Sequence, residues 1–187
     1  MGLRRLLPAL ACVALTASLS GCFLEQDEEA GAARREGLDV RVGGIDYNVF
    51  ITRELNPSLP DDRSYWHGPE AKPGHALYGV FIQACNRSDD DEDLDDATYD
   101  ATDDFTVEDT QGNRYEPLKP EEDNSFHYHP TPLEPGKCIP QLGSLAQLGP
   151  TGGAMIPFLF PLEAGENRPL ELEIRSGSEV GRVELDL

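Results

Sequence analysis

Apolar residues alternate with polar ones in short stretches from residue 38 to the end of the chain, and turn residues separate the stretches. A period of two is typical of β-strands with one buried face, and no stretch here has a convincing helical period. The alternating residues are Leu38, Val40 and Val42; Tyr47, Val49 and Ile51; Phe105 and Val107; Tyr115 and Leu118; Leu170, Leu172 and Ile174; and Val183, Leu185 and Leu187. Seven or eight short strands at this spacing predict an all-β fold, an antiparallel β-sandwich.

Two further stretches are too apolar for strands with one solvent-exposed face. Residues 76–86 (ALYGVFIQACN) are apolar on both alternations, which predicts a central strand covered on both faces. Residues 155–162 are as apolar but include Pro157 and Pro161. Because proline has no N–H to donate to a neighbouring strand, we expect this stretch to be broken or to lie at a sheet edge.

The first 21 residues have the layout of an export signal peptide. Two arginines precede an apolar run that is too short to span a membrane. The run ends in Leu19-Ser20-Gly21-Cys22, which resembles the lipobox of bacterial lipoproteins, in which the cysteine is lipidated and becomes the new N-terminus. The alternative is an ordinary secreted protein, cut before Gly21. The lipobox predicts a lipid on Cys22 and a location on the extracytoplasmic face of the cell membrane.

The number of cysteines favours lipidation. Cys12 leaves with the signal peptide, so Cys22, Cys85 and Cys138 remain, an odd number in an oxidising compartment. A lipid on Cys22 leaves Cys85 and Cys138 as a pair. We therefore expect a structural disulfide between them, stabilising the fold by about 4 kcal/mol. The alternative is two separate buried thiols.

Composition defines a tether, one domain and a strong acidic excess. Residues 22–37 have no apolar period and are expected to be a disordered tether, and residues 38–187 have the length of one domain.

The chain contains 35 acidic and 15 basic residues, a formal net charge of −20. This charge excludes nucleic acid as a partner and gives no attraction to an anionic membrane, so the lipid alone must hold the protein there. It favours solubility, cations or a basic partner.

Several segments occur in an order that resembles a known family. They are VFIQACNRSDD (80–90), DFTVEDTQGNRYEPL (104–118), LEPGKC (133–138), MIPFLF (155–160) and LELEI (170–174). Their order is similar to the immunoglobulin-like domain of unknown function in exported bacterial lipoproteins, a superfamily that includes a secreted mycobacterial antigen. The resemblance implies an immunoglobulin-like sandwich acting as a non-enzymatic binding or structural module. It implies no functional residues, and the chain departs from the pattern at residues 56–74 and in its acidic run.

The acidic run DDDEDLDD at residues 89–96 is a candidate calcium site. Calcium takes six to eight oxygen ligands, and carboxylates at alternate positions of a loop can supply them. The candidate ligands are Asp89, Asp91, Asp93, Asp95 and Asp100. An EF-hand fits poorly because Leu94 replaces the turn glycine and no helices flank the run, so the hypothesis is a looser site between sandwich loops. The alternative is a solvated loop that its own charges keep extended.

His127 and His129 lie on one side of the chain if their segment is extended. Such a pair is half of a zinc or copper site, which His67 or His75 would complete. The alternative is a pair of exposed loop histidines, which the nearby prolines favour.

Tyr65 and Trp66 precede the predicted central strand and are candidates for an aromatic patch that binds a partner. The alternative is that they belong to the core. The sequence has neither a nucleophile elbow nor a phosphate-binding glycine loop, so we expect no enzyme. It predicts a lipid-anchored, non-enzymatic binding or structural module with an envelope protein as partner and no cofactor. A calcium-binding lipoprotein and a zinc or copper carrier are the alternatives.

Overall fold

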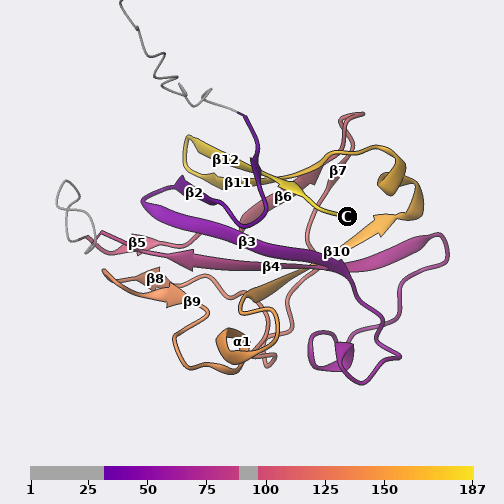
Figure 1. The fold of residues 1–187 in the computed structure, drawn as a ribbon, viewed down its shortest axis with the longest axis horizontal. Coiled ribbons are helices and arrows are strands. Elements are labelled where there is room, and N and C mark those ends of the chain that lie inside the picture. The colour runs from indigo at the N-terminus through magenta and orange to yellow at the C-terminus, as the bar shows by residue number, and fades with distance from the viewer. Residues whose placement is uncertain (1–31, 89–96) are drawn as a thin grey trace, which may run out of the picture.

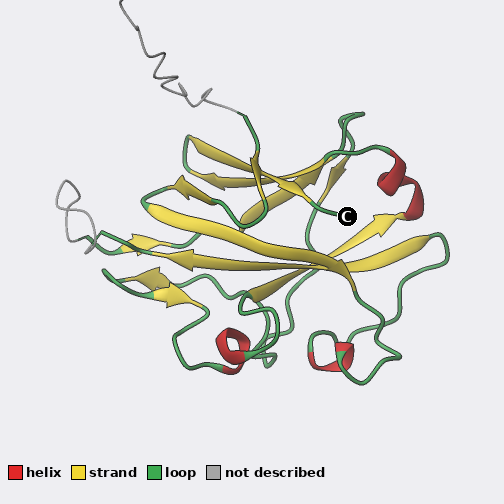
Figure 2. Cartoon of the chain, in the orientation of Figure 1, coloured by secondary structure: helices red, strands yellow, loops and turns green. Residues whose placement is uncertain are grey.

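The computed structural model describes residues 32–88 and 97–187, and within these ranges the chain is almost entirely β-structure. Two sheets pack face to face, and loops form a third layer on the outer face of one of them (Figures 1 and 2). Among the described strands, seven have four or more residues and five have two. The predicted β-sandwich is confirmed, and the two-residue strands extend it.

The first sheet, sheet A, has the strand order β1, β12, β11, β6, β7. β1 runs parallel to β12, and the other neighbours are antiparallel. The apolar residues of β11 face the core, and its charged residues lie on the outer face, as the alternation predicts. The bounds are β1 Arg34–Arg35, β6 Asp104–Glu108, β7 Arg114–Tyr115, β11 Leu170–Ser176 and β12 Glu179–Leu185.

The second sheet, sheet B, has the order β10, β4, β3, β2, and a short β9 also pairs with β4. β10 is at the end of this order, as its prolines predict. On the side away from β4, the Pro157 carbonyl accepts a hydrogen bond from the Leu118 N–H (2.7 Å). A bulge at Phe50 interrupts the register of β3 with β4. The bounds are β2 Asp39–Val42, β3 Ile45–Glu54, β4 His75–Cys85, β9 Cys138–Ile139 and β10 Ala154–Pro161.

The remaining described elements are small. A two-stranded sheet joins β5 (Tyr99–Asp100) to β8 (Pro132–Leu133). The helical turns are η1 Asp62–Ser64, α1 Leu145–Leu148 and η2 Leu162–Glu166. In the part of the chain that the structure describes, no helix has the length and apolar character needed to cross a membrane.

β4 belongs to two apolar cores. Val80, Ile82 and Ala84 face the main core between the sheets, where β11 contributes Leu172 and Ile174. Leu77 and Phe81 point to the other side and enter a second, smaller core under the loop layer. The expectation of a central strand covered on both faces is therefore correct. The hydrophobic effect of burying both faces makes β4 the centre of the fold.

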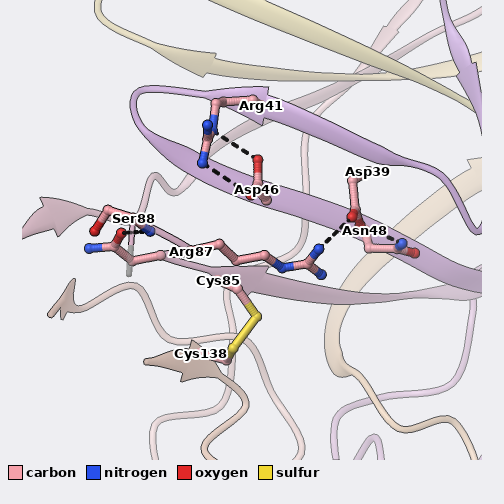
Figure 3. Close-up of a disulfide and its surroundings, with 9 residues drawn as sticks. Asp39, Arg41, Asp46, Asn48, Cys85, Arg87, Ser88 and Cys138 are labelled. Atoms are coloured by element: carbon pink, nitrogen blue, oxygen red, sulfur yellow. Dashed lines mark hydrogen bonds and ion pairs between the residues drawn. A yellow bond between two sulfur atoms is a disulfide. The ribbon is translucent and has the colours of Figure 1, made fainter. Parts of the chain in front are cut away.

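The disulfide between Cys85 and Cys138 is present and joins the end of β4 to β9 (Figure 3). The two residues lie directly opposite each other in the β4–β9 register, with their Cα atoms 4.1 Å apart. Just beyond it, Arg87 forms an ion pair with Asp39 of β2 (2.8 Å). The predicted pairing of these two cysteines is confirmed.

Asn86, next to the disulfide, is fully buried and ties several segments together. Its Nδ2 donates hydrogen bonds to the carbonyls of Ala97 and Leu133 (both 2.8 Å), and its Oδ1 accepts from the Ser88 N–H (3.2 Å). Its backbone bonds with Lys137 and Gly136. Ser88 and Ala97 flank the acidic run, so one amide side chain holds both of these flanking residues.

Residues before 38, the predicted start of the domain, already make contacts with both sheets. β1 pairs with the end of β12, and the Gly37 N–H donates to the Val49 carbonyl (2.7 Å). The Glu36 carboxylate accepts hydrogen bonds from the N–H groups of Thr52 and Asp186 (both 3.2 Å), so it links the two sheets. Burial raises the pKa of Glu36. These long-range contacts correct the predicted boundary, because a polar segment without an apolar period can still pair at a sheet edge.

Candidate functional site

The second core has its centre at Phe81 of β4 and is closed by residues from two loops, at 55–71 and 118–126. The Tyr65 ring meets the Phe81 and Phe126 rings edge to face, with centroid distances of 5.1 and 5.0 Å. Trp66 is buried, and its Nε1 donates to the Pro69 carbonyl (2.9 Å). Tyr65 and Trp66 are therefore core residues, and the predicted exposed aromatic patch is wrong for both.

His127 is buried beside Trp66, and both of its ring nitrogens have protein partners. The Glu121 N–H donates to Nδ1 (2.8 Å), so the ring proton is on Nε2, which donates to the Tyr65 carbonyl (2.7 Å). Burial lowers the pKa of His127 and keeps the ring neutral. No lone pair is left for a metal, so the predicted zinc or copper ligand at His127 is wrong. The ring instead joins the two loops.

Glu121 joins the same two loops from their outer side. Its carboxylate accepts from the His67 N–H (2.9 Å) and from Asn124 Nδ2 (3.0 Å), and His67 Nδ1 lies 3.0 Å from it. Burial would raise the pKa of Glu121, but the hydrogen bonds from Asn124 and His67 outweigh it and lower the pKa. His129 is half-buried, with Nε2 3.4 Å from the Asn124 carbonyl. The loop layer is therefore fixed by polar contacts, of which those of Glu121 are exposed or partly buried.

An apolar groove of about 820 Å³ lies on this layer between the η1 loop and the α1 loop. We call it the leucine groove. One wall carries Leu59 and Asp61, the other carries Leu145 and Leu148, and Tyr65 and Phe126 line it as well. The lining is mainly apolar, which is typical of binding sites.

The leucines of the groove are strongly exposed, two of them on α1 and Leu59 in the turn before η1. The exposed fractions are 53% for Leu59, 65% for Leu145 and 71% for Leu148. Ala146 is buried, so α1 turns its small residue inward and its two leucines, three positions apart, outward. Each large apolar side chain left exposed in this way contributes about 1.5–3 kcal/mol less to the stability of the fold than it would if it were buried.

Polar caps hold α1, which is too short to be stable by itself. Ser144 Oγ accepts a hydrogen bond from the Gln147 N–H (3.3 Å), and Gln147 Oε1 accepts from the Gly143 N–H (3.2 Å). This reciprocal pattern is close to a capping box. The wall that presents Leu145 and Leu148 is therefore a defined structure.

Arg53 of β3 fixes the opposite wall. Its guanidinium lies over the rings of Tyr65 and Phe81, 5.4 and 5.5 Å from their centroids. It forms an ion pair with the buried Asp62 (2.7 Å), whose other oxygen accepts from the Asn56 N–H (2.8 Å). These contacts join the η1 loop to sheet B and to the second core.

The outer face of sheet A is different, because it is charged. Glu173 is buried there among arginine side chains and pairs with Arg175 and with Arg182 (2.8 Å). Burial would raise the pKa of Glu173, but the hydrogen bonds from Arg182 and Arg175 outweigh this and lower it. A neighbouring turn is organised by Asp109, whose carboxylate accepts from Gln111, Asn113, Tyr115 and Asn167. These carboxylates all have partners within the fold, so they hold structure together.

Several predicted site residues are not brought together. Cys22 and the calcium ligands Asp89, Asp91, Asp93 and Asp95 lie outside the described residues, and Asp100 is exposed in β5. Within residues 32–88 and 97–187, no group of three or more His, Cys, Asp or Glu side chains is placed to hold a metal ion. Sequence reasoning missed the leucine groove. The signal that could have found it is the capping serine Ser144, which predicts a short helical turn with Leu145 and Leu148 three positions apart on one face.

Comparison with known proteins adds fold similarity only. No protein-family model matches the sequence, and no curated protein matches it. The crystal structure of the yjhA protein from Bacillus subtilis is similar over 82% of this chain and 99% of that chain, with 10% identity and a TM-score of 0.48. An uncharacterized β-sandwich protein from Clostridium difficile 630 is similar over 83% and 97%, with 10% identity and a TM-score of 0.40. The β-sandwich assignment rests on the strand pairing of the chain itself.

Proposed function

We propose that this protein is a lipid-anchored, extracytoplasmic and non-enzymatic binding module of the bacterial cell envelope, and that it binds an envelope protein through the leucine groove. The fold is a β-sandwich, which agrees with the immunoglobulin-like sandwich that the resemblance to exported lipoproteins implies. The observation that carries the binding role is the groove itself, with Leu145 and Leu148 exposed on α1 and Leu59 exposed on the facing loop.

The cysteines support the location. Cys85 and Cys138 form a disulfide, which is typical of proteins in oxidising compartments. This pairing leaves Cys22 as the odd cysteine, at the position where Leu19-Ser20-Gly21-Cys22 resembles a lipobox. A lipid there would account for all the cysteines of the mature chain.

The arrangement of layers supports the orientation. The anchor enters through β1, which pairs with β12 in sheet A, whereas the groove lies in the loop layer on the far side of sheet B. In Figure 1, β12 and α1 accordingly lie on opposite sides of the molecule. The groove and the point where the tether joins the domain therefore lie on opposite faces of the domain, which leaves the groove accessible to other components of the envelope.

The side chains that most often serve as nucleophile or base support a non-enzymatic role. Cys85 and Cys138 are bonded to each other, and both ring nitrogens of the buried His127 make structural hydrogen bonds. Each of these groups therefore already has a structural role in the fold.

Mass spectrometry of the protein from bacterial cells tests the anchor. We expect the mature chain to begin at Cys22 with a diacylglyceryl modification and to fractionate with membranes. Cys22→Ser should release the protein from the membrane fraction, while the matched control Cys12→Ser should leave the mature protein unchanged. An unmodified N-terminus at another residue would refute lipid anchoring.

Photo-crosslinking in intact cells tests the groove. A benzophenone amino acid at Leu148 should give a discrete crosslinked product with one envelope protein, identified by mass spectrometry. The same amino acid at Val180, on the charged outer face of sheet A, is the control and should not give that product. Equal products from both positions would argue against the groove as the binding surface.

A further inference from the structure

We infer that the occupant of the leucine groove is a polypeptide segment with leucine-sized apolar side chains on one face and a lysine or arginine beside them. This inference names the partner class and rests on the proposed binding role of the groove. It follows from the shape, the charge and the position of the groove in the fold.

The apolar part of the inference follows from the two walls. Leu145 and Leu148 lie one helical turn apart on α1, and Leu59 lies on the facing wall. Groove sites of this kind accept an amphipathic segment whose apolar residues recur every three or four positions. Phe126, which is half-buried, adds an aromatic ring to the lining that such side chains can contact.

The basic part follows from the charges around the groove. The lining contains the carboxylates of Asp61 and Asp62 and one cation, Arg53, which is already paired with Asp62. Asp61 is exposed, and the loop that carries Phe126 also carries Glu122 and Asp123, both exposed. The chain as a whole has a formal net charge of −20. A cationic segment would be attracted to this face, and an acidic one would be repelled.

The position of the groove favours a polypeptide over the lipid bilayer. β1, the first strand after the proposed anchor, belongs to sheet A, and the groove lies in the loop layer on the far side of sheet B. The acidic surroundings of the leucines also oppose contact with anionic headgroups, because like charges repel. A basic and apolar segment of a neighbouring protein satisfies both conditions.

Selection from a phage-displayed library of random 12-residue peptides tests the inference. The bait is the full-length gene product, purified from whichever fraction contains it, held in phosphatidylcholine nanodiscs if it is lipidated. Empty nanodiscs serve to remove lipid-binding peptides. We expect enriched peptides with apolar residues three or four positions apart and an excess of lysine and arginine over acidic residues.

Matched variants then locate the binding. Leu145→Asp with Leu148→Asp should weaken an enriched synthetic peptide at least tenfold, while Leu162→Asp, at a leucine of η2 that is equally exposed (64%) but outside the groove, should not change it. Asp61→Lys should reduce the preference for basic peptides. Circular dichroism checks that the variants remain folded.

Four results would overturn the inference. They are enriched peptides without a basic excess, equal binding to the groove and control variants, Leu148-dependent binding to phosphatidylcholine vesicles, and a Leu148-dependent dimer in sedimentation equilibrium. Because the bait is used from either cell fraction, failure of the lipid anchor would not produce any of these results. The two proposals are thus tested separately.

Discussion

Reduction of the Cys85–Cys138 disulfide should lower the free energy of unfolding by about 4 kcal/mol. The two cysteines are 53 positions apart, and closing a loop of this size removes about 14 cal/mol/K of entropy from the unfolded chain, or about 4 kcal/mol at 25 °C. The folded state should change little, because Asn86 and the β4–β9 pairing hold the same segments in place without the cross-link. The loss should therefore arise mainly in the unfolded state.

Urea titration of the oxidised and the reduced chain measures this loss. Trp66 is the single tryptophan and is buried against His127, so its fluorescence reports unfolding of the loop layer. With a denaturant slope of about 2 kcal/mol/M, the midpoint should fall by about 2 M. The Cys85→Ala, Cys138→Ala double variant is the control and should not respond to reductant. A loss below about 1 kcal/mol in the reduced chain would refute the loop-closure reasoning.

Three further predictions concern buried polar groups. Asn86→Ala should lower the free energy of unfolding by about 2–4 kcal/mol in the same urea titration, because two buried carbonyls lose their donor. Burial lowers the pKa of His127, so the unfolded chain binds a proton at a higher pH than the folded chain does. The free energy of unfolding should therefore fall as the pH drops below about 6.5. In His127→Gln this pH dependence should be flatter between pH 7.5 and 5. Burial opposes ionisation of Asp109, but hydrogen bonds from Asn113, Asn167 and Gln111 lower its pKa from 3.8 to about 2. Its contribution to the free energy of unfolding is therefore present above pH 4 and lost toward pH 2. Thermal unfolding of Asp109→Asn should not show this loss of stability.

Local pattern was sufficient for the longer strands, and the number of cysteines was sufficient for the disulfide. The alternation at Leu170, Leu172 and Ile174 depends only on which face of β11 is buried, and it was correct. The two-sided apolar character of β4 predicted its central position for the same reason. Cys85 and Cys138 were predictable because lipidation of Cys22 would leave them as the only remaining pair.

Contacts between distant residues explain what the sequence did not reveal. Trp66 is buried only because its loop packs on Met155 and Phe81, which are distant in sequence. His127 is unable to bind a metal partly because its Nε2 donates to the carbonyl of Tyr65, 62 positions away. β1 is two residues long, and its place in sheet A depends on β12 near the opposite end of the chain. The leucine groove likewise needs α1 and η1 to lie side by side, which no local pattern encodes.

Asn86 also makes the chain a convenient scaffold for protein engineering. Its side chain holds Ser88 and Ala97, so the two positions that border residues 89–96 are fixed from within the domain. Each doubling of a closed loop costs only about 0.6 kcal/mol, so a longer insert between these two anchors should be tolerated. An epitope or a fluorescent reporter could therefore be placed there while the disulfide and the leucine groove remain intact.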